Sequence, residues 1–199
     1  MSDVSRTART QGAQSQRSSS RARSRGWSTR KVVTLALFTA LCIILSFVEI
    51  ALFPAAPYLK YDPSAVVAVF AAFAYGPASG LLVGAVAAVV HGLFMGDPWG
   101  SLMTVIVLVC LIVPAGLVYR AKPTRAGALA GLVVGAVLSI AGAVVGNLLI
   151  TPIYTGTSVE AVAALIVPVL LPFNVIKAAV NVVLAFLLYE PVEKLVAKR

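Results

Sequence analysis

Acidic, histidine and cysteine residues are scarce in this chain of 199 residues, and their scarcity excludes several kinds of site. Only 7 residues are Asp or Glu, 1 is His and 2 are Cys. With His91 as the only histidine and no CxxC pair, a zinc or haem site lacks ligands. Cys42 and Cys110 lie inside apolar runs, which predicts small packing residues and no disulfide framework. A GxxxxGKS/T phosphate loop is also missing, so we expect no ATPase site in this chain.

Apolar residues dominate what is present. Hydrophobic residues make up 60% of the chain, charged residues only 12%, and the mean hydropathy is +0.97. This composition is far outside the range of soluble proteins. We therefore predict an all-α integral membrane protein, since an unclosed strand would leave backbone polar groups unpaired in lipid. We do not expect a membrane enzyme, because paired intramembrane carboxylates and a Ser/His arrangement are both missing.

Prolines, glycines and charges divide the apolar sequence into six segments. The uncharged run over residues 63–96 is too long for one crossing of about 20 residues, and Gly76-Pro77 is its natural break. Pro168 and Pro172 are expected to interrupt the last segment. The six predicted transmembrane helices cover residues 32–53, 63–76, 77–96, 98–119, 126–150 and 161–189.

Basic residues lie in three places: before the first helix, at residues 120–125 and at the C-terminus. Residues 1–30 contain seven arginines and little to bury, which predicts a disordered Arg/Ser-rich cytoplasmic tail before a six-helix domain over residues 31–199. Six crossings place all three basic clusters inside, so both termini are predicted to be cytoplasmic in a multi-pass protein of the cell membrane. Contact with anionic lipid explains the charge of the tail without a nucleic-acid partner, and RNA binding is the alternative.

Few polar groups lie inside the predicted helices, where they are costly and by default functional. Asn174, Lys177 and Asn181 are spaced to lie along one face of the last helix, with Lys177 near its middle. This face is predicted to contact a ligand or a partner. Asn147 in the fifth helix is a second candidate, for which an interhelical hydrogen bond is the alternative.

Three segments of the chain resemble those of a known family. They read PYLKYDPSAVVAVFAAFAYGPASG at residues 57–80, GNLLITPIY at 146–154 and LLPFNVIKA at 170–178. In this order they resemble the riboflavin-specific S components, which are the substrate-binding subunits of energy-coupling factor (ECF) transporters. The resemblance implies binding and uptake of riboflavin as a transported ligand, with no cofactor, and the substrate-binding residues it implies are Asn147, Asn174, Lys177, Lys60 and Tyr58.

The resemblance also implies partners. Ala36 and Ala40 look like the AxxxA motif with which S components dock on a transmembrane coupling subunit, and two ABC ATPases would supply the energy. Gly84 and Ala87 stand where riboflavin members have a charged pair, so another vitamin, such as pantothenate or thiamine, is an alternative ligand. A self-sufficient ion-coupled carrier, using acidic residues and His91, is the other alternative.

Overall fold

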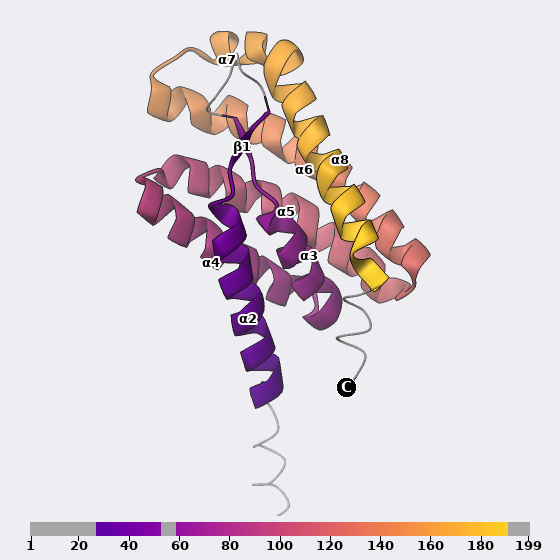
Figure 1. The fold of residues 1–199 in the computed structure, drawn as a ribbon. Helices are drawn as coiled ribbons and strands as arrows, with labels where there is room; N and C mark the ends of the chain where they lie inside the picture. The colour runs from indigo at the N-terminus through magenta and orange to yellow at the C-terminus, as the bar shows by residue number, and fades with distance from the viewer. Residues whose placement is uncertain (1–26, 53–58, 191–199) are drawn as a thin grey trace, which may run out of the picture. The chain divides into compact units, whose positions relative to one another are not determined.

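The computed structural model describes residues 27–52 and 59–190, and most of them lie in helices (Figure 1). The chain divides into two compact units, Met1–Val33 and Thr34–Arg199, and the helical core lies in the second. Most of the predicted tail is outside the described residues. A π-helix, η2 (Ile166–Leu170), joins the last two α-helices. The α-helices are α2 (Thr29–Ser46), α3 (Ser64–Tyr75), α4 (Pro77–Met95), α5 (Pro98–Ala121), α6 (Arg125–Thr155), α7 (Val159–Leu165) and α8 (Leu171–Leu187).

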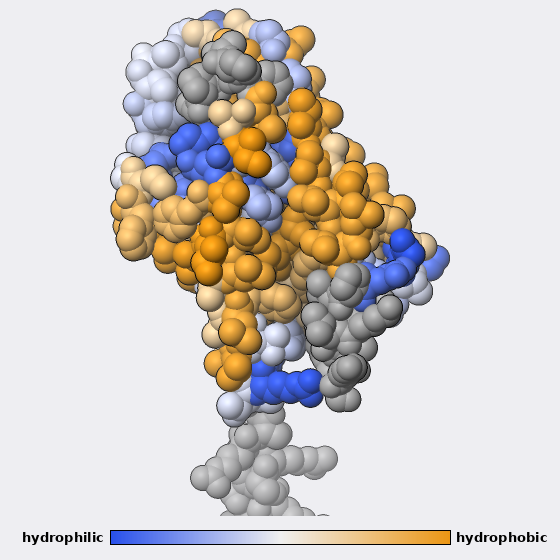
Figure 2. All heavy atoms as spheres, viewed as in Figure 1, coloured by the Kyte–Doolittle hydropathy of each residue, from blue (hydrophilic) through white to orange (hydrophobic). Residues whose placement is uncertain are grey.

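The prediction of an all-α membrane fold with six apolar helical segments is confirmed. Within the described residues, α2, α4, α5, α6 and the continuous run Val159–Leu187 are long and apolar enough to cross a membrane. The remaining segment, α3, has only 12 residues. At 1.5 Å a residue it extends about 18 Å, less than the roughly 30 Å of a hydrocarbon core. Large apolar side chains are exposed along the long helices, and Figure 2 shows them as an extended hydrophobic surface.

Helix α3 lies at the centre of the core instead of facing lipid. All its residues from Ser64 to Ala72 are buried, as expected for a helix that is apolar on every side. The helix ends at Gly76, whose φ of +96° favours glycine and whose N–H donates to the Ala72 carbonyl at 2.8 Å. Pro77 then begins α4, so the predicted break at Gly76-Pro77 is confirmed.

Helices α5 and α6 approach each other closely because of glycines on α6. A Cβ atom built on Gly131 would lie 2.6 Å from the Ala115 carbonyl oxygen, and one on Gly135 would lie 2.4 Å from that of Leu111. Small residues allow helix backbones this proximity in lipid.

Two predicted helix ends differ from the structure by five residues or more, and the others by three or fewer. The first helix was expected to reach residue 53, but α2 ends at Ser46 and the chain enters a short hairpin, in which β1 (Ile50–Ala51) pairs antiparallel with β2 (Lys60–Tyr61). Strand pairing gives the backbone N–H and C=O groups hydrogen-bond partners. A helix continued into the following prolines would lack some of these hydrogen bonds. The fifth helix was expected to end at residue 150, but α6 continues through Pro152 to Thr155, where Gly156 caps it with an N–H to the Pro152 carbonyl at 3.0 Å.

Candidate functional site

A cavity of about 640 Å³ lies among helices α3, α5, α6 and α8 and the end of the hairpin. Three connections between helices contribute to it: Lys60 lies in β2, Asp97 precedes α5, and Thr157 lies between α6 and α7. Figure 2 shows hydrophilic atoms at the level of the hairpin, within the otherwise hydrophobic surface.

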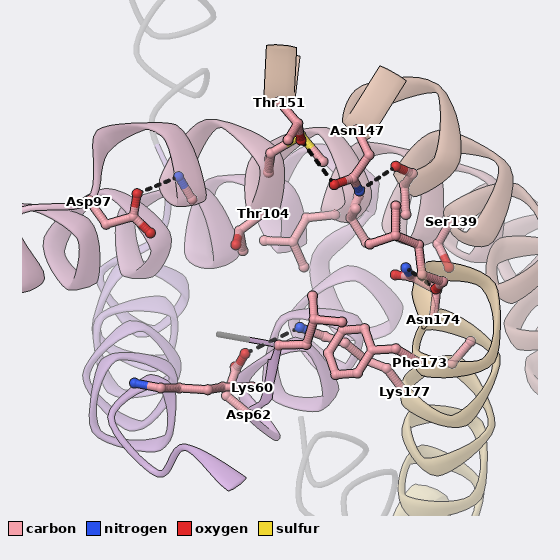
Figure 3. Close-up of a pocket in the computed structure, with 18 of the residues that line it drawn as sticks. Lys60, Asp62, Asp97, Thr104, Ser139, Asn147, Thr151, Phe173, Asn174 and Lys177 are labelled. Atoms are coloured by element: carbon pink, nitrogen blue, oxygen red, sulfur yellow. Dashed lines mark hydrogen bonds and ion pairs between the residues drawn. The ribbon is translucent and has the colours of Figure 1, made fainter. Parts of the chain in front are cut away.

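Two asparagines present their amide groups to the cavity from different helices (Figure 3). Asn147 of α6 donates from Nδ2 to the Ala143 carbonyl at 2.8 Å, and its Oδ1 accepts from the Thr151 hydroxyl at 3.1 Å. Asn174 of α8 donates from Nδ2 to the Leu170 carbonyl, at the end of the π-helix, at 2.8 Å. These bonds set the side-chain rotamers and leave each amide a second N–H and further acceptor capacity for a ligand. The interhelical hydrogen bond considered for Asn147 is not formed, because both of its partners lie on its own helix.

Lys177, one turn beyond Asn174, is paired in the cavity. Its Nζ lies 3.4 Å from Asp62 Oδ2, and both side chains are about 20% exposed. Asp62 Oδ1 accepts from the backbone N–H of Ser64 at 3.1 Å and also from the Ser64 hydroxyl. The ion pair keeps the ammonium group at the cavity wall, where a lysine without a partner would be costly.

A second contact joins β2 to the same face of α8. The Tyr61 hydroxyl donates to Asn181 Oδ1 at 3.1 Å, and both residues are buried. Burial, with the neighbouring Asp62 carboxylate, raises the pKa of Tyr61 from its ordinary 10.0 to about 12. Tyr61 therefore remains a neutral donor at physiological pH. Asn181, predicted as part of the polar face, lines the cavity and helps to hold it together.

Lys60 lines the cavity, but its amino group is directed away from Lys177 (Figure 3). Its Nζ is 2.5 Å from Glu49 Oε2, and Glu49 Oε1 lies 3.3 Å from His91 Nε2 of α4. Glu49 thus lies between the amino group of Lys60 and the imidazole of His91. Tyr58, also predicted to bind substrate, lies outside the described residues.

Apolar side chains form the rest of the wall. Phe173 of α8 is only 6% exposed and lies beside Lys177 at the cavity (Figure 3). At the rim, Tyr154 stacks on Trp99 with ring centroids 5.8 Å apart. A pocket of this size with mostly apolar walls and a few convergent polar groups is typical of a small-molecule site.

The structure brings together four of the five predicted substrate-binding residues and adds others that the sequence reading did not select. Asp62 and Thr151 are the main additions, with Thr104 and Ser139 also facing the cavity (Figure 3). The four-residue spacing of Asn147 and Thr151 was a usable signal for Thr151, whereas nothing local paired Asp62 with Lys177. Ala36 and Ala40 lie on the exposed side of α2 and do not line the cavity.

Comparison with known proteins identifies the family of this chain. The family model described as ECF transporter, substrate-specific component, matches residues 30–189. The chain belongs to this family. It is therefore a multi-pass membrane protein that works with the other subunits of an ECF transporter, and a transport component instead of an enzyme.

Individual proteins are similar to this S component over most of its length. The riboflavin transporter RibU of Staphylococcus aureus (strain TCH60) is 26% identical over 167 residues, which cover 80% of this chain and 88% of the relative. The riboflavin transporter FmnP of Bacillus subtilis (strain 168) is 29% identical over 172 residues, covering 80% and 90%. A solved S component of a bacterial ECF transporter is 25% identical, with a TM-score of 0.75, covering 87% of this chain and all of that one.

Proposed function

We propose that this S component binds riboflavin in the cavity between α3, α5, α6 and α8 and delivers it for uptake. The observation that carries the proposal is the convergence of Asn147, Asn174 and Lys177 on one cavity with an aromatic wall at Phe173. The relatives named riboflavin transporters support this choice of ligand over pantothenate or thiamine.

The chemistry of the cavity suits a flavin. An asparagine amide offers a donor and an acceptor to the imide edge of the ring, and Lys177 can donate to a carbonyl or ribityl oxygen. The buried ring of Phe173 and the apolar side chains of α5 provide a surface for the flat ring system. In this proposal, Asn147, Asn174, Lys177 and Lys60 contact the ligand, and Tyr58 is a further candidate.

Energy for uptake comes from partners in this proposal. A transmembrane coupling subunit and two ABC ATPases complete the transporter, and Ala36 and Ala40 dock on the coupling subunit. Both alanines are exposed on α2, beside the exposed side chains of Val33 and Leu37, so they are accessible from the lipid phase. Uptake that persists in cells lacking the ATPases would favour a self-sufficient carrier instead.

Quenching of riboflavin fluorescence by the detergent-purified protein tests ligand and site together. Lys177→Ala or Asn174→Ala should each weaken binding by about 1–3 kcal/mol, or about 5- to 150-fold in Kd, because a buried hydrogen-bonding group is lost. Lys122→Ala is the matched control, since Lys122 is an exposed lysine at the C-terminal cap of α5. A folded wild-type protein that leaves the fluorescence unchanged would show that riboflavin is the wrong ligand.

A further inference from the structure

The amide of Asn147 is held from both of its sides by its own helix. Its Nδ2 donates to the Ala143 carbonyl, one turn before it, and its Oδ1 accepts from the Thr151 hydroxyl, one turn after it (Figure 3). Among the described residues, Asn174 is bonded at Nδ2 only, to the Leu170 carbonyl. Asn147 and Asn174 therefore differ in how the orientation of the amide is fixed.

The orientation of an amide decides which of its sides donates a hydrogen bond and which accepts one. A half turn about the last side-chain bond exchanges the oxygen and the NH2 group with almost no change in shape. A carbonyl can only accept, so the Ala143 carbonyl requires the NH2 group on its side. The Thr151 hydroxyl donates to the amide oxygen and so favours the same orientation from the opposite side.

The hydroxyl of Thr151 differs from other threonine hydroxyls in its choice of acceptor. Thr39 of α2 and Thr155 of α6 donate to the backbone carbonyl four residues before them, at 2.8 and 2.7 Å. Thr151 donates instead to a side chain that lines the cavity, at 3.1 Å. Because a hydroxyl has a single hydrogen, Thr151 cannot donate it to a ligand while this bond remains. The arrangement favours an indirect role for Thr151 in ligand binding.

We propose that Thr151 is a positioning residue, which fixes the orientation of the Asn147 amide and affects ligand binding only through that amide. The proposal rests on the proposed binding of riboflavin. The amide is held in one orientation before the ligand arrives, so binding does not have to select that orientation from two. Without the hydroxyl of Thr151, only the Ala143 carbonyl fixes the amide, and Oδ1 loses its donor.

The test measures the Kd of riboflavin by fluorescence quenching on the purified full-length chain. Thr151→Val keeps the shape of the side chain and replaces its hydroxyl with a methyl group, so it should weaken binding by about 3- to 10-fold, as expected for one lost hydrogen bond. Thr151→Ser keeps the hydroxyl and should bind within about twofold of wild type. Thr39→Val is the matched control, because it removes a helical threonine hydroxyl that does not line the cavity, and it should leave the Kd unchanged.

A double-mutant cycle with Asn147→Ala separates positioning from direct contact with the ligand. In protein that already carries Asn147→Ala, the further change Thr151→Val should alter the Kd by less than about twofold, because the amide that Thr151 holds is gone. The protein is titrated to concentrations above the weakened Kd, so that binding is measured in all four members of the cycle.

Each outcome decides one point. Wild-type affinity in Thr151→Val, or equal weakening in Thr151→Ser or Thr39→Val, would overturn the role of the Thr151 hydroxyl. Weakening of the same size in the Asn147→Ala background would show that Thr151 contacts the ligand directly and would overturn the positioning role. Thr151→Ala gives the same comparison if Thr151→Val does not fold. No binding of riboflavin by folded wild type would instead refute the proposed function.

Discussion

Gly135→Ala should destabilise the protein because α6 cannot accommodate a methyl group against α5. The Cβ of alanine would lie 2.4 Å from the Leu111 carbonyl oxygen and 3.3 Å from the Ala115 Cβ. Ordinary contact begins near 3.4 Å, so the two backbones must separate by about 1 Å, and neither can move alone. Overpacking of this kind costs about 1–3 kcal/mol, more than the gain of about 0.5–1 kcal/mol from replacing a helical glycine.

The measurement is thermal unfolding in detergent, with Gly146→Ala as the matched control on the same helix. A Cβ at Gly146 would lie 3.0 Å from the terminal methyl group of Met103, a flexible side chain that can rotate away. Gly146→Ala should therefore be close to neutral in stability, whereas Gly135→Ala should lower the Tm. Equal Tm values for Gly135→Ala and wild type would refute the close backbone contact between α5 and α6.

The remaining predictions concern the hydrogen bond between Tyr61 and Asn181 and the exposed side of α2. Tyr61→Phe should lower the free energy of unfolding by about 1–3 kcal/mol, because it leaves the buried Asn181 oxygen without its donor, and chemical denaturation would measure this. The pKa of Tyr61 is about 12 in the folded state against an ordinary 10.0. Its contribution to the free energy of unfolding should therefore be complete below pH 10 and be lost as the pH rises towards 12. In Tyr61→Phe, this part of the loss of stability at alkaline pH should be missing. Ala40→Leu should abolish riboflavin uptake by cells while leaving riboflavin binding unchanged, because Ala40 is exposed on α2 and away from the cavity; loss of binding would place the effect in the fold instead of the docking surface.

Local sequence signals predicted the helices well where the chain contains a strong breaker. Gly76-Pro77 separates α3 from α4 as expected, because a positive φ and a missing N–H act within one or two residues. Local sequence signals failed where contact with a distant segment determines the secondary structure. Residues 50–51 look like the end of an apolar helix, but they pair with Lys60–Tyr61, and no local pattern records that pairing.

In the candidate site, local spacing was again predictive and contacts between distant segments were not. Asn174, Lys177 and Asn181 were predicted to share a face, since helical spacing alone requires it, and all three line the cavity. The partner of Lys177 was not predictable, because Asp62 is 115 residues away in sequence and reaches it only through the packing of α3 against α8. Lys60, also predicted to contact the substrate, lines the cavity, and its amino group pairs with Glu49, the residue before β1.

The sequence by itself determined that this protein lies in a membrane, which segments form its helices and which polar groups those helices carry. Composition, helical period and breakers set these features, and each acts over a few residues or over the whole chain. Only the tertiary structure decided that α3 is enclosed by the other helices, that a hairpin follows α2 and that Asp62 neutralises Lys177. The physical reason is that helices distant in sequence must pack together before their polar side chains can pair. How closely two helices pack depends on which glycines of one helix face the backbone of the other, and no local sequence pattern records this.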